Sequence, residues 1–454
     1  MKRILAIALV AAFILGSVSF ASAAELKVTG EFKSNAQWQG NSDFSDDNSS
    51  EDEFGIRSRA RIIFRYSASD NLSAVLRIQY GTIKWGNQAT GGLIDTQSNT
   101  NIYLRRAYLE FKWPDTQILM QAGKLSLALP NYLGSAILGA DTTAFVVSSP
   151  ITDNVKLMAG FARAIDANVT DDGDDPLREE WDHIFLGAPL SFDGISLTPF
   201  VDFSILGNGI TAAGIPDSVL LADIFSPAGA AGQAFDDDYV YPWWAGLVLN
   251  MKMFDPFIVK GEFNWGMITD GEDATERSGW LADLELSYTG IDFMVPKIFG
   301  MYSSGEDDDI DNGSERMPIA ADDWTPKGSY FFGGSDLLDG DLDNPTVGLW
   351  TVGLALEDIK FIDKLSSLLA VYYIAGTSDS AIVDEAPGYL TYGRQLTDED
   401  YLVEIDFNHK YMIYEQLAAI LELSYIVNGY DKDTWDIDNK SDAWKIGFGF
   451  NYNF

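Results

Sequence analysis

The segment from Phe54 to Ala68, FGIRSRARIIFRYSA, limits what this chain can fold into more than any other. Because successive side chains of an extended strand point to opposite faces, the segment has two very different faces. One face is mostly apolar, and the other carries a ladder of four arginines: Arg57, Arg59, Arg61 and Arg65. Four arginines cannot be buried in a dry core without partners, but they can line water. One face toward hydrocarbon and one toward an aqueous lumen is typical of a transmembrane β-barrel strand.

The same alternation continues to the last residue, and the connections between strands alternate in length. Tight turns such as 69–71 follow long polar segments such as 39–53, and this order holds downstream. Bacterial barrels have short periplasmic turns and longer extracellular loops. We therefore predict an all-β fold, a transmembrane antiparallel β-barrel of 18 strands, or 16 if segments 143–148 and 155–163 belong to a loop.

The first 24 residues have the features of an export signal. Lys2 and Arg3 precede an apolar stretch, and Ala21-Ser22-Ala23 forms an A-x-A cleavage site. We expect cleavage after Ala23 or Ala24, which leaves residues 25–454 as one barrel domain in the bacterial outer membrane. The apolar run is short for a membrane-spanning helix. Since the chain has no cysteine, neither a disulfide nor a thiolate metal site is possible.

Charge is distributed unevenly along the chain, whose formal net charge is −38. Residues 25–125 contain 12 basic and 12 acidic residues, whereas residues 126–454 contain 16 basic and 56 acidic ones. So acidic a chain is not expected to bind nucleic acid through phosphate contacts. Its 12 Trp, 20 Tyr and 27 Phe argue against disorder.

The predicted polar faces are segregated by the sign of their charge. Arg77 and Arg106, on the next two strands, extend the arginine ladder into a basic wall. The later strands carry acidic residues instead: Asp202, Glu262, Asp283, Glu285, Glu404, Asp406 and Glu422. In a closed barrel these two sets lie across the lumen from one another. This arrangement predicts a transverse field inside a water-filled tube, lined by both sets.

Two segments carry a resemblance to a known family. The last strand, Asp442 to Phe454, has alternating aromatics and resembles the signal by which the outer-membrane assembly machinery recognises its clients. The segment from Leu104 to Phe145 is similar to the strand, turn, strand and inward-folded third loop of trimeric general porins. In that family a Gly-Arg or Gly-Lys step, here Gly123-Lys124, ends the fifth strand. The chain most resembles the outer-membrane homotrimeric porins of sulfate-reducing bacteria.

This resemblance implies a homotrimer in contact with outer-membrane lipid and lipopolysaccharide. It also implies that a third loop, about Ser126 to Thr142, folds into the lumen and narrows the pore. Lys124 and Asp141 would then line the constriction, and Asp141 alone remains of the acidic cluster found in enterobacterial porins. Opposite the arginines, this loop predicts a constriction with net positive lining. Small anions should pass at least as readily as cations.

Acidic runs in the predicted loops have two interpretations. Asp339-x-Asp341-x-Asp343 resembles the start of a calcium loop, and calcium takes carboxylate oxygens. Asn344 stands where glycine is required, however, and no suitably placed glutamate closes the loop. We therefore favour solvated charge, and we expect no required cofactor.

The sequence gives little support to catalysis. His183 and His409 are its only histidines, and it lacks a G-x-S-x-G segment and a Gly-rich phosphate loop. We predict a channel for passive diffusion of small hydrophilic solutes and ions. Two alternatives remain: a substrate-specific channel for a sugar or an organic anion, and a structural barrel whose lumen is plugged.

Overall fold

The computed structural model describes residues 25–45, 53–94, 102–166, 180–207, 239–269, 276–309, 312–320, 324, 328–338, 340, 342 and 347–454. The export signal predicted at residues 1–24 lies outside these residues, as do the possible calcium ligands Asp339, Asp341 and Asp343. Within the described ranges, no helix is both long enough and apolar enough to span a membrane.

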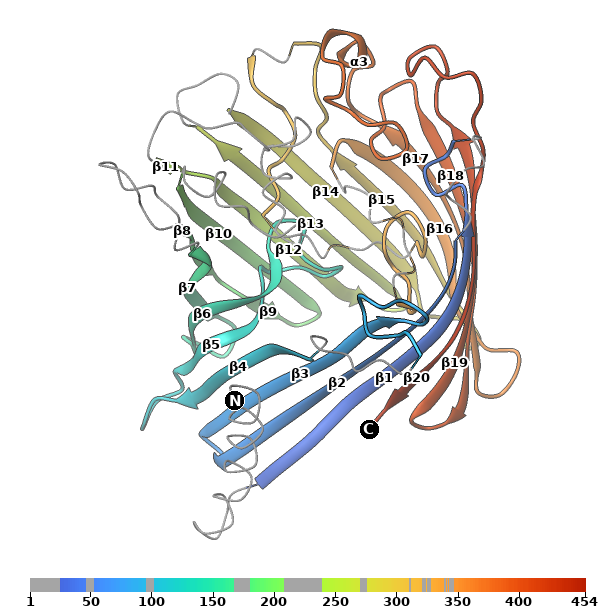
Figure 1. Cartoon of the computed structure of the whole chain (residues 1–454). Coiled ribbons are helices and arrows are strands. Elements are labelled where there is room, and N and C mark those ends of the chain that lie inside the picture. The colour runs from blue at the N-terminus through green and yellow to red at the C-terminus, as the bar shows by residue number, and fades with distance from the viewer. Residues whose placement is uncertain are drawn as a thin grey trace.

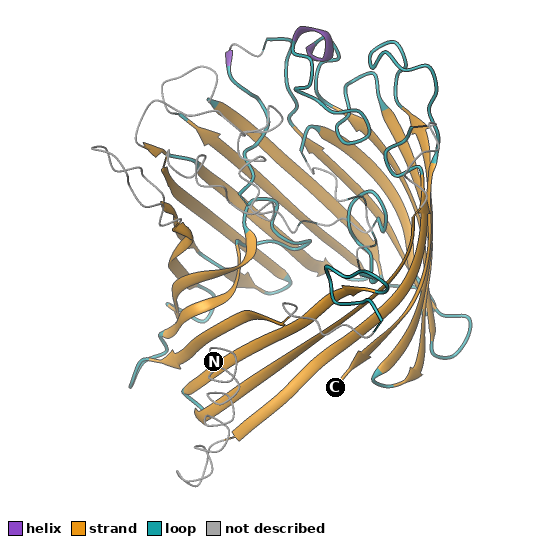
Figure 2. Ribbon diagram, in the orientation of Figure 1, coloured by secondary structure: helices purple, strands orange, loops and turns teal. Residues whose placement is uncertain are grey.

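One antiparallel sheet contains every strand of the described residues and closes on itself (Figures 1 and 2). Its first half comprises β1 (Glu25–Gly40), β2 (Glu53–Ser69), β3 (Leu72–Lys84), β4 (Ile102–Lys112), β5 (Leu119–Ala128), β6 (Gly139–Pro150), β7 (Lys156–Asp166), β8 (Glu180–Gly187), β9 (Leu190–Phe192) and β10 (Ile195–Gly207). Its second half comprises β11 (Tyr239–Val240), β12 (Trp243–Phe254), β13 (Phe257–Ile268), β14 (Arg277–Tyr288), β15 (Val295–Ser303), β16 (Leu349–Ile359), β17 (Leu365–Gly376), β18 (Tyr401–Tyr414), β19 (Leu417–Gly429) and β20 (Ala443–Asn453).

Two of these segments are pieces of longer strands. β8 and β9 both pair with β10 along one of its edges, and β11 and β12 both pair with it along the other. Counted this way, the described residues form the 18 strands that the sequence predicts. Segments 143–148 and 155–163, the alternative loop residues, correspond to the strands β6 and β7. Pairing of β1 with β20 closes the barrel.

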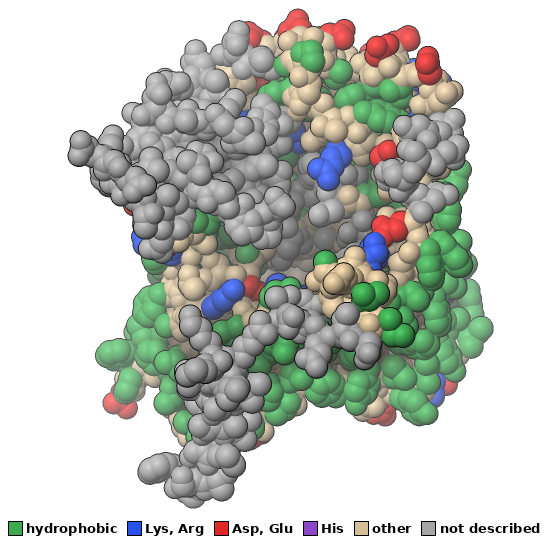
Figure 3. All heavy atoms as spheres, viewed as in Figure 1, with side chains coloured by type: hydrophobic (Ala, Val, Ile, Leu, Met, Phe, Trp, Pro, Cys, Tyr) green, Lys and Arg blue, Asp and Glu red, His purple; other side chains and the backbone are tan. Residues whose placement is uncertain are grey.

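The outward face of the barrel is a hydrophobic band. On β20, for example, the alternate residues Ile446, Phe448 and Phe450 are exposed, whereas Lys445, on the other face of the strand, is buried. This pattern follows from strand alternation, with the apolar side chains turned toward hydrocarbon. Figure 3 shows hydrophobic side chains over the strands and acidic ones along the upper rim.

Long and short connections lie at opposite ends of the barrel, as predicted. Tight turns such as Asp255-Pro256 join strands at one end. At the other end, residues 377–400 form a long connection that includes α3 (Ile382–Glu385), at the top of Figure 1. Short turns mark the periplasmic end of a bacterial barrel, so α3 lies on the extracellular side.

Two connections fold into the lumen and partly fill it. The β5–β6 connection, residues 129–138, is the predicted inward third loop. It contacts the β15–β16 connection, residues 304–348, through a hydrogen bond of 2.9 Å from the Ala320 amide to the Ile137 carbonyl. Around this contact lies a buried apolar core: Leu129, Ile137, Ile319, Trp324, Phe331, Phe332 and Tyr372. The acidic runs of this connection predict a solvated loop, so the entry of its described residues 312–320, 324 and 328–338 into the lumen is a correction.

Candidate functional site: the basic wall of the lumen

The predicted arginine ladder lies on the inward face of the first strands. The ladder register places Arg61 opposite Gln79 of β3, and Arg77 opposite Arg106 of β4. Side-chain contacts follow this register, since Arg61 Nε donates to Gln79 Oε1 at 2.7 Å. We call the following residues the basic wall: Lys33, Arg57, Arg59, Arg61, Arg65, Arg77, Arg105 and Arg106.

The carboxylates on this wall are shared among its arginines. Glu31 lies 3.3 Å from Arg61 and 3.6 Å from Arg59. Asp141 contacts Arg105 and Arg106, each at 2.6 Å. Because one carboxylate neutralises one charge, each of these clusters keeps a net positive charge that can face water.

Arg105 belongs to this wall although the sequence pattern did not indicate it. Simple alternation places Arg105 and Arg106 on opposite faces of a strand. The pairing of β3 with β4 shifts register after Arg77, however, so β4 contains a bulge at this point. A bulge re-aims a side chain, and here it lets both arginines reach Asp141.

Arg77 differs from the other arginines of the wall in its partners. Within the described part of the chain, it makes no ion pair or side-chain hydrogen bond. The carboxylates whose charges act on Arg77 are Asp141 and Glu31, and each of them is already paired with two other arginines. An arginine presents five N–H donors in a planar fork, so Arg77 can receive a carboxylate or phosphate group from the lumen.

Lys124 does not line the lumen, which corrects the sequence prediction. The register places it beside Ala107 and Thr143. Ala107 in turn pairs with Leu76, on the outward face of β3. Pairing of β4 with β5 ends at Lys124, and from there the β5–β6 hairpin bends inward and brings Asp141 to the arginines. Alternation is weak in this short strand, so the facing of Lys124 could not be read from sequence.

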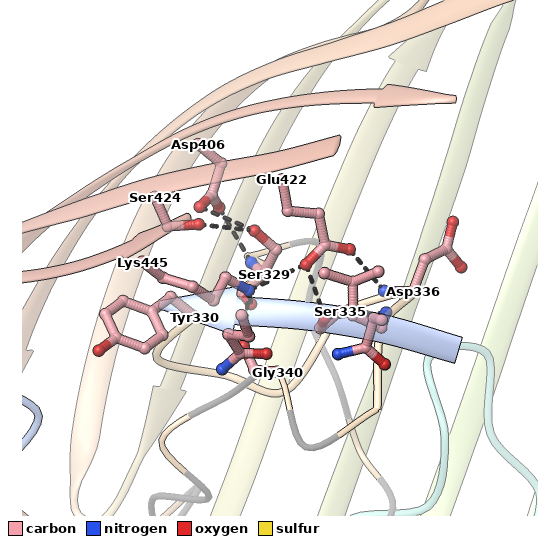
Figure 4. Close-up of polar contacts among 12 residues, drawn as sticks. Ser329, Tyr330, Ser335, Asp336, Gly340, Asp406, Glu422, Ser424 and Lys445 are labelled. Atoms are coloured by element: carbon pink, nitrogen blue, oxygen red, sulfur yellow. Dashed lines mark hydrogen bonds and ion pairs between the residues drawn. The ribbon is translucent and has the colours of Figure 1, made fainter. Parts of the chain in front are cut away.

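The acidic residues of the later strands lie on the inner wall, but they are covered. Their exposed fractions are between 0% and 6% for Glu262, Asp283, Glu285, Glu404, Asp406 and Glu422. Figure 4 shows the covering segment against Asp406 and Glu422. Glu404 accepts hydrogen bonds from the amides of Tyr330 and Phe331, at 2.9 and 3.2 Å. Asp406 accepts one from the Ser329 amide at 2.9 Å.

The remaining acids of this wall are engaged in the same way. Asp283 accepts the Trp324 indole N–H at 3.1 Å, and Glu262 accepts the Tyr132 amide at 3.4 Å. Burial, followed by the charge of Asp283, raises the pKa of the Tyr132 phenol. The predicted transverse field between two water-lined walls is therefore wrong for these six residues. Five of them accept main-chain or indole N–H groups rather than facing the open lumen, and Glu285 accepts the Ser287 hydroxyl and pairs with Lys297.

Both histidines have side-chain partners. His183 Nδ1 lies 2.8 Å from Asp202 Oδ2, and both residues are buried between Trp181 and Trp244. Asp202 is thus also covered, although the sequence placed it on the acidic wall. His409 Nδ1 lies 2.8 Å from Ser367 Oγ.

Comparisons with known proteins identify the fold. No family model and no curated protein matches the sequence. Solved structures do match over nearly the whole chain. OccK2 (OpdF) of Pseudomonas aeruginosa matches with a TM-score of 0.54 and 9% identity, covering 95% of this chain and 98% of that one. The outer membrane protein opdK of the same species gives 0.53 and 11%, with coverage of 95% and 98%.

A BenF-like porin from Pseudomonas fluorescens Pf-5 gives a TM-score of 0.53 and 7% identity, with coverage of 95% and 99%. The fold is that of an outer-membrane porin. The chain therefore shares the closed antiparallel β-barrel of these solved outer-membrane proteins. Identities this low establish the fold alone, so the solute must be argued from the basic wall.

Proposed function

We propose that the protein is a passive channel for small hydrophilic solutes that favours anions, organic carboxylates among them. The observation that carries this proposal is the Arg77 guanidinium, which faces the lumen without a carboxylate partner among the described residues. Arg61 and Arg106, which have shared partners, lie on either side of it. A solute carboxylate at Arg77 would complete the pairing that this wall lacks.

The acidic character of the whole chain does not oppose this preference. Loop charges at the rim sit in water and are screened within about 8 Å at physiological salt. Charges on a lumen wall act over a few ångströms in a confined volume, where screening is weaker. Since the acidic wall is covered, the basic wall dominates what a solute meets.

A substrate-specific channel for an organic anion is the second candidate. Arg77 favours it, because a single unpaired guanidinium among paired ones is a defined place for one carboxylate. A saturable current carried by one organic anion would support this candidate. A current that rises in proportion to concentration would support general diffusion.

The test of the first proposal is the reversal potential of single channels under a salt gradient. Wild type should be anion-selective, and the double variant Arg59→Ala with Arg61→Ala should move toward cations. Arg163→Ala is a matched control, because Arg163 pairs with Asp182 on β8, away from the basic wall. A strongly cation-selective wild type, unchanged by the double variant, would refute the proposal.

We further propose that the barrel assembles as a homotrimer, as in the porins of sulfate-reducing bacteria that the sequence resembles, surrounded by outer-membrane lipid and lipopolysaccharide. Small side chains on the outward faces of β2 to β4, Ser58, Ala60, Ala74 and Ala107, suit close protein contact. Lys124 strengthens the argument, because it pairs with Ala107 on this face and a lysine is costly against hydrocarbon.

The trimer is tested by measuring the molar mass of the purified protein in mild detergent. Ala107→Trp should dissociate the assembly, because the large ring separates the faces. Ala282→Trp, on the outward face of β14, is the matched control and should leave the mass unchanged. A monomeric wild type would contradict this proposal.

A further inference from the structure

One lysine of the last strand holds the covering segment against the barrel wall. We call residues 328–338 the lumenal segment; it runs along the inner face of β18 to β20 (Figure 4). Lys445 of β20 is 1% exposed and reaches this segment from the wall. Its Nζ donates to the carbonyl of Ser329 and, at 2.5 Å, to the carbonyl of Gly340 just beyond the segment. One ammonium group therefore ties together both ends of the segment.

Glu422 of β19 completes this attachment. It lies 2.9 Å from Lys445 Nζ. Its other contacts go to the middle of the segment, since it accepts the Ser335 hydroxyl at 2.6 Å and the Asp336 amide at 2.7 Å. An ammonium has three donors, and Lys445 uses them on Ser329, Gly340 and Glu422.

The segment can leave the wall only if these polar groups find other partners. A buried carbonyl or carboxylate that loses its donor is strongly disfavoured. Removing the Lys445 ammonium would strand two carbonyls and the Glu422 charge at once. Moving the segment into the lumen water would satisfy all three, so we expect the segment to move.

We propose that the buried Lys445–Glu422 pair sets the size limit of the pore by holding the lumenal segment against the wall. This inference rests on the proposed channel function, and it adds the residues that determine which solutes fit. An exposed ion pair of the segment contributes less to holding it than this buried pair does. Lys410, for example, meets Asp336 at 3.5 Å with both side chains about half exposed, and such surface pairs contribute little.

The experiment compares single-channel conductance and the entry of uncharged polyethylene glycols of increasing mass. Lys445→Met keeps the length of the side chain and removes its charge. Because the released segment would enter the lumen, we expect a lower or noisier conductance and a smaller size limit than in wild type. Lys410→Met is the matched control, because Lys410 also contacts the segment but is exposed. This variant should behave as wild type. Equal conductance and size limit in Lys445→Met and wild type would overturn the inference.

A disulfide staple provides the reciprocal test. The chain has no cysteine, and Ser329 Oγ lies 3.0 Å from Ser424 Oγ on the wall. In the Lys445→Met background, oxidised Ser329→Cys with Ser424→Cys should restore wild-type conductance and size limit, and reduction should abolish the restoration. No difference between the two redox states would contradict the inference.

Two further outcomes keep the channel function and this inference apart. If Lys445→Met does not assemble, the double variant Lys445→Met with Glu422→Gln removes both buried charges together and replaces it in both measurements. If wild type is silent and the variant conducts, the segment is a plug: the attachment by Lys445 is then supported and the proposed open channel is refuted. If wild type and the variant are both silent, the proposed open channel and the size-limiting role are both refuted.

Discussion

At the scale of single residues, the chemistry of this lumen depends on carboxylates that are too few for their arginines. Glu31 serves Arg59 and Arg61, and Asp141 serves Arg105 and Arg106. The carboxylates orient the guanidinium groups without cancelling their charge. Selectivity can therefore be changed in either direction by single substitutions.

Glu31→Gln should increase the preference for anions. The change keeps the shape of the side chain but leaves the charges of Arg59 and Arg61 uncompensated. A unit charge 4 Å from an ion is worth about 1 kcal/mol in water, so the anion-to-cation permeability ratio should rise by up to about fivefold. Reversal potentials would measure it. Glu357→Gln, whose partner Lys297 lies on the far wall, is the control, and a ratio that falls in Glu31→Gln would contradict the proposed role of the wall.

Sequence predicts the facing of a residue where alternation is regular, and it fails where the backbone departs from it. The four arginines of β2 lie in an unbroken alternating run, so their inward facing was predictable. Arg105 was missed because a bulge leaves no mark in the pattern of apolar residues. Lys124 was misplaced because it lies in a short strand, directly after Gly123, whose φ is 128°. Alternation also does not predict that an inward residue such as Glu404 will be covered by another segment of the chain.

At the scale of elements, the two ends of the chain close the barrel together. The Phe454 amide donates to the Gly30 carbonyl at 3.0 Å, and the Gly30 amide donates to the Phe454 carbonyl at 2.8 Å. A Cβ on Gly30 would lie 2.6 Å from the Phe454 ring, so glycine is required for this contact. The last residue is thus part of the seam as well as of the aromatic outward face.

Phe454→Ser should lower the amount of assembled barrel in the outer membrane without altering the conductance of the barrels that do form. The substitution removes the terminal aromatic that packs on Gly30 and leaves the lumen untouched. Quantifying the heat-resistant folded band in membrane fractions would measure it. Phe407→Ser, an outward aromatic of an internal strand, separates a lost terminal signal from lost lipid contact. Wild-type levels for Phe454→Ser would count against this role.

The β15–β16 connection was the element least predictable from sequence. Its acidic residues and glycines are typical of a solvated loop. One indication was available: Tyr330, Phe331 and Phe332 are three consecutive aromatics in an otherwise polar stretch, and such a cluster requires burial. Where it is buried depends on hydrogen-bond partners on β18 to β20, which no local pattern contains.

At the scale of the whole molecule, the inward connections of the described residues fill the half of the lumen that lies beside the later strands. The charge-balanced N-terminal quarter of the chain supplies the basic wall, and the acidic remainder supplies the wall beneath the inward connections. The number of strands and the order of short and long connections could be predicted, because both depend on periodicity and length. The inward third loop was implied only by the family resemblance. The filling of this half of the lumen could not be predicted, because it depends on contacts between residues such as Asn35 and Leu338, 303 positions apart.

The filled half also changes how this barrel should respond to temperature. Most apolar surface of a membrane barrel leaves water by entering lipid rather than by packing inside the protein. Here Trp324, Phe331 and Phe332 are removed from lumen water instead, so their burial carries the heat-capacity signature of a soluble protein core. That contribution weakens on cooling. The passage through this protein is therefore bordered on one side by a wall fixed by its hydrogen-bond ladder, and on the other by packing whose strength depends on water itself.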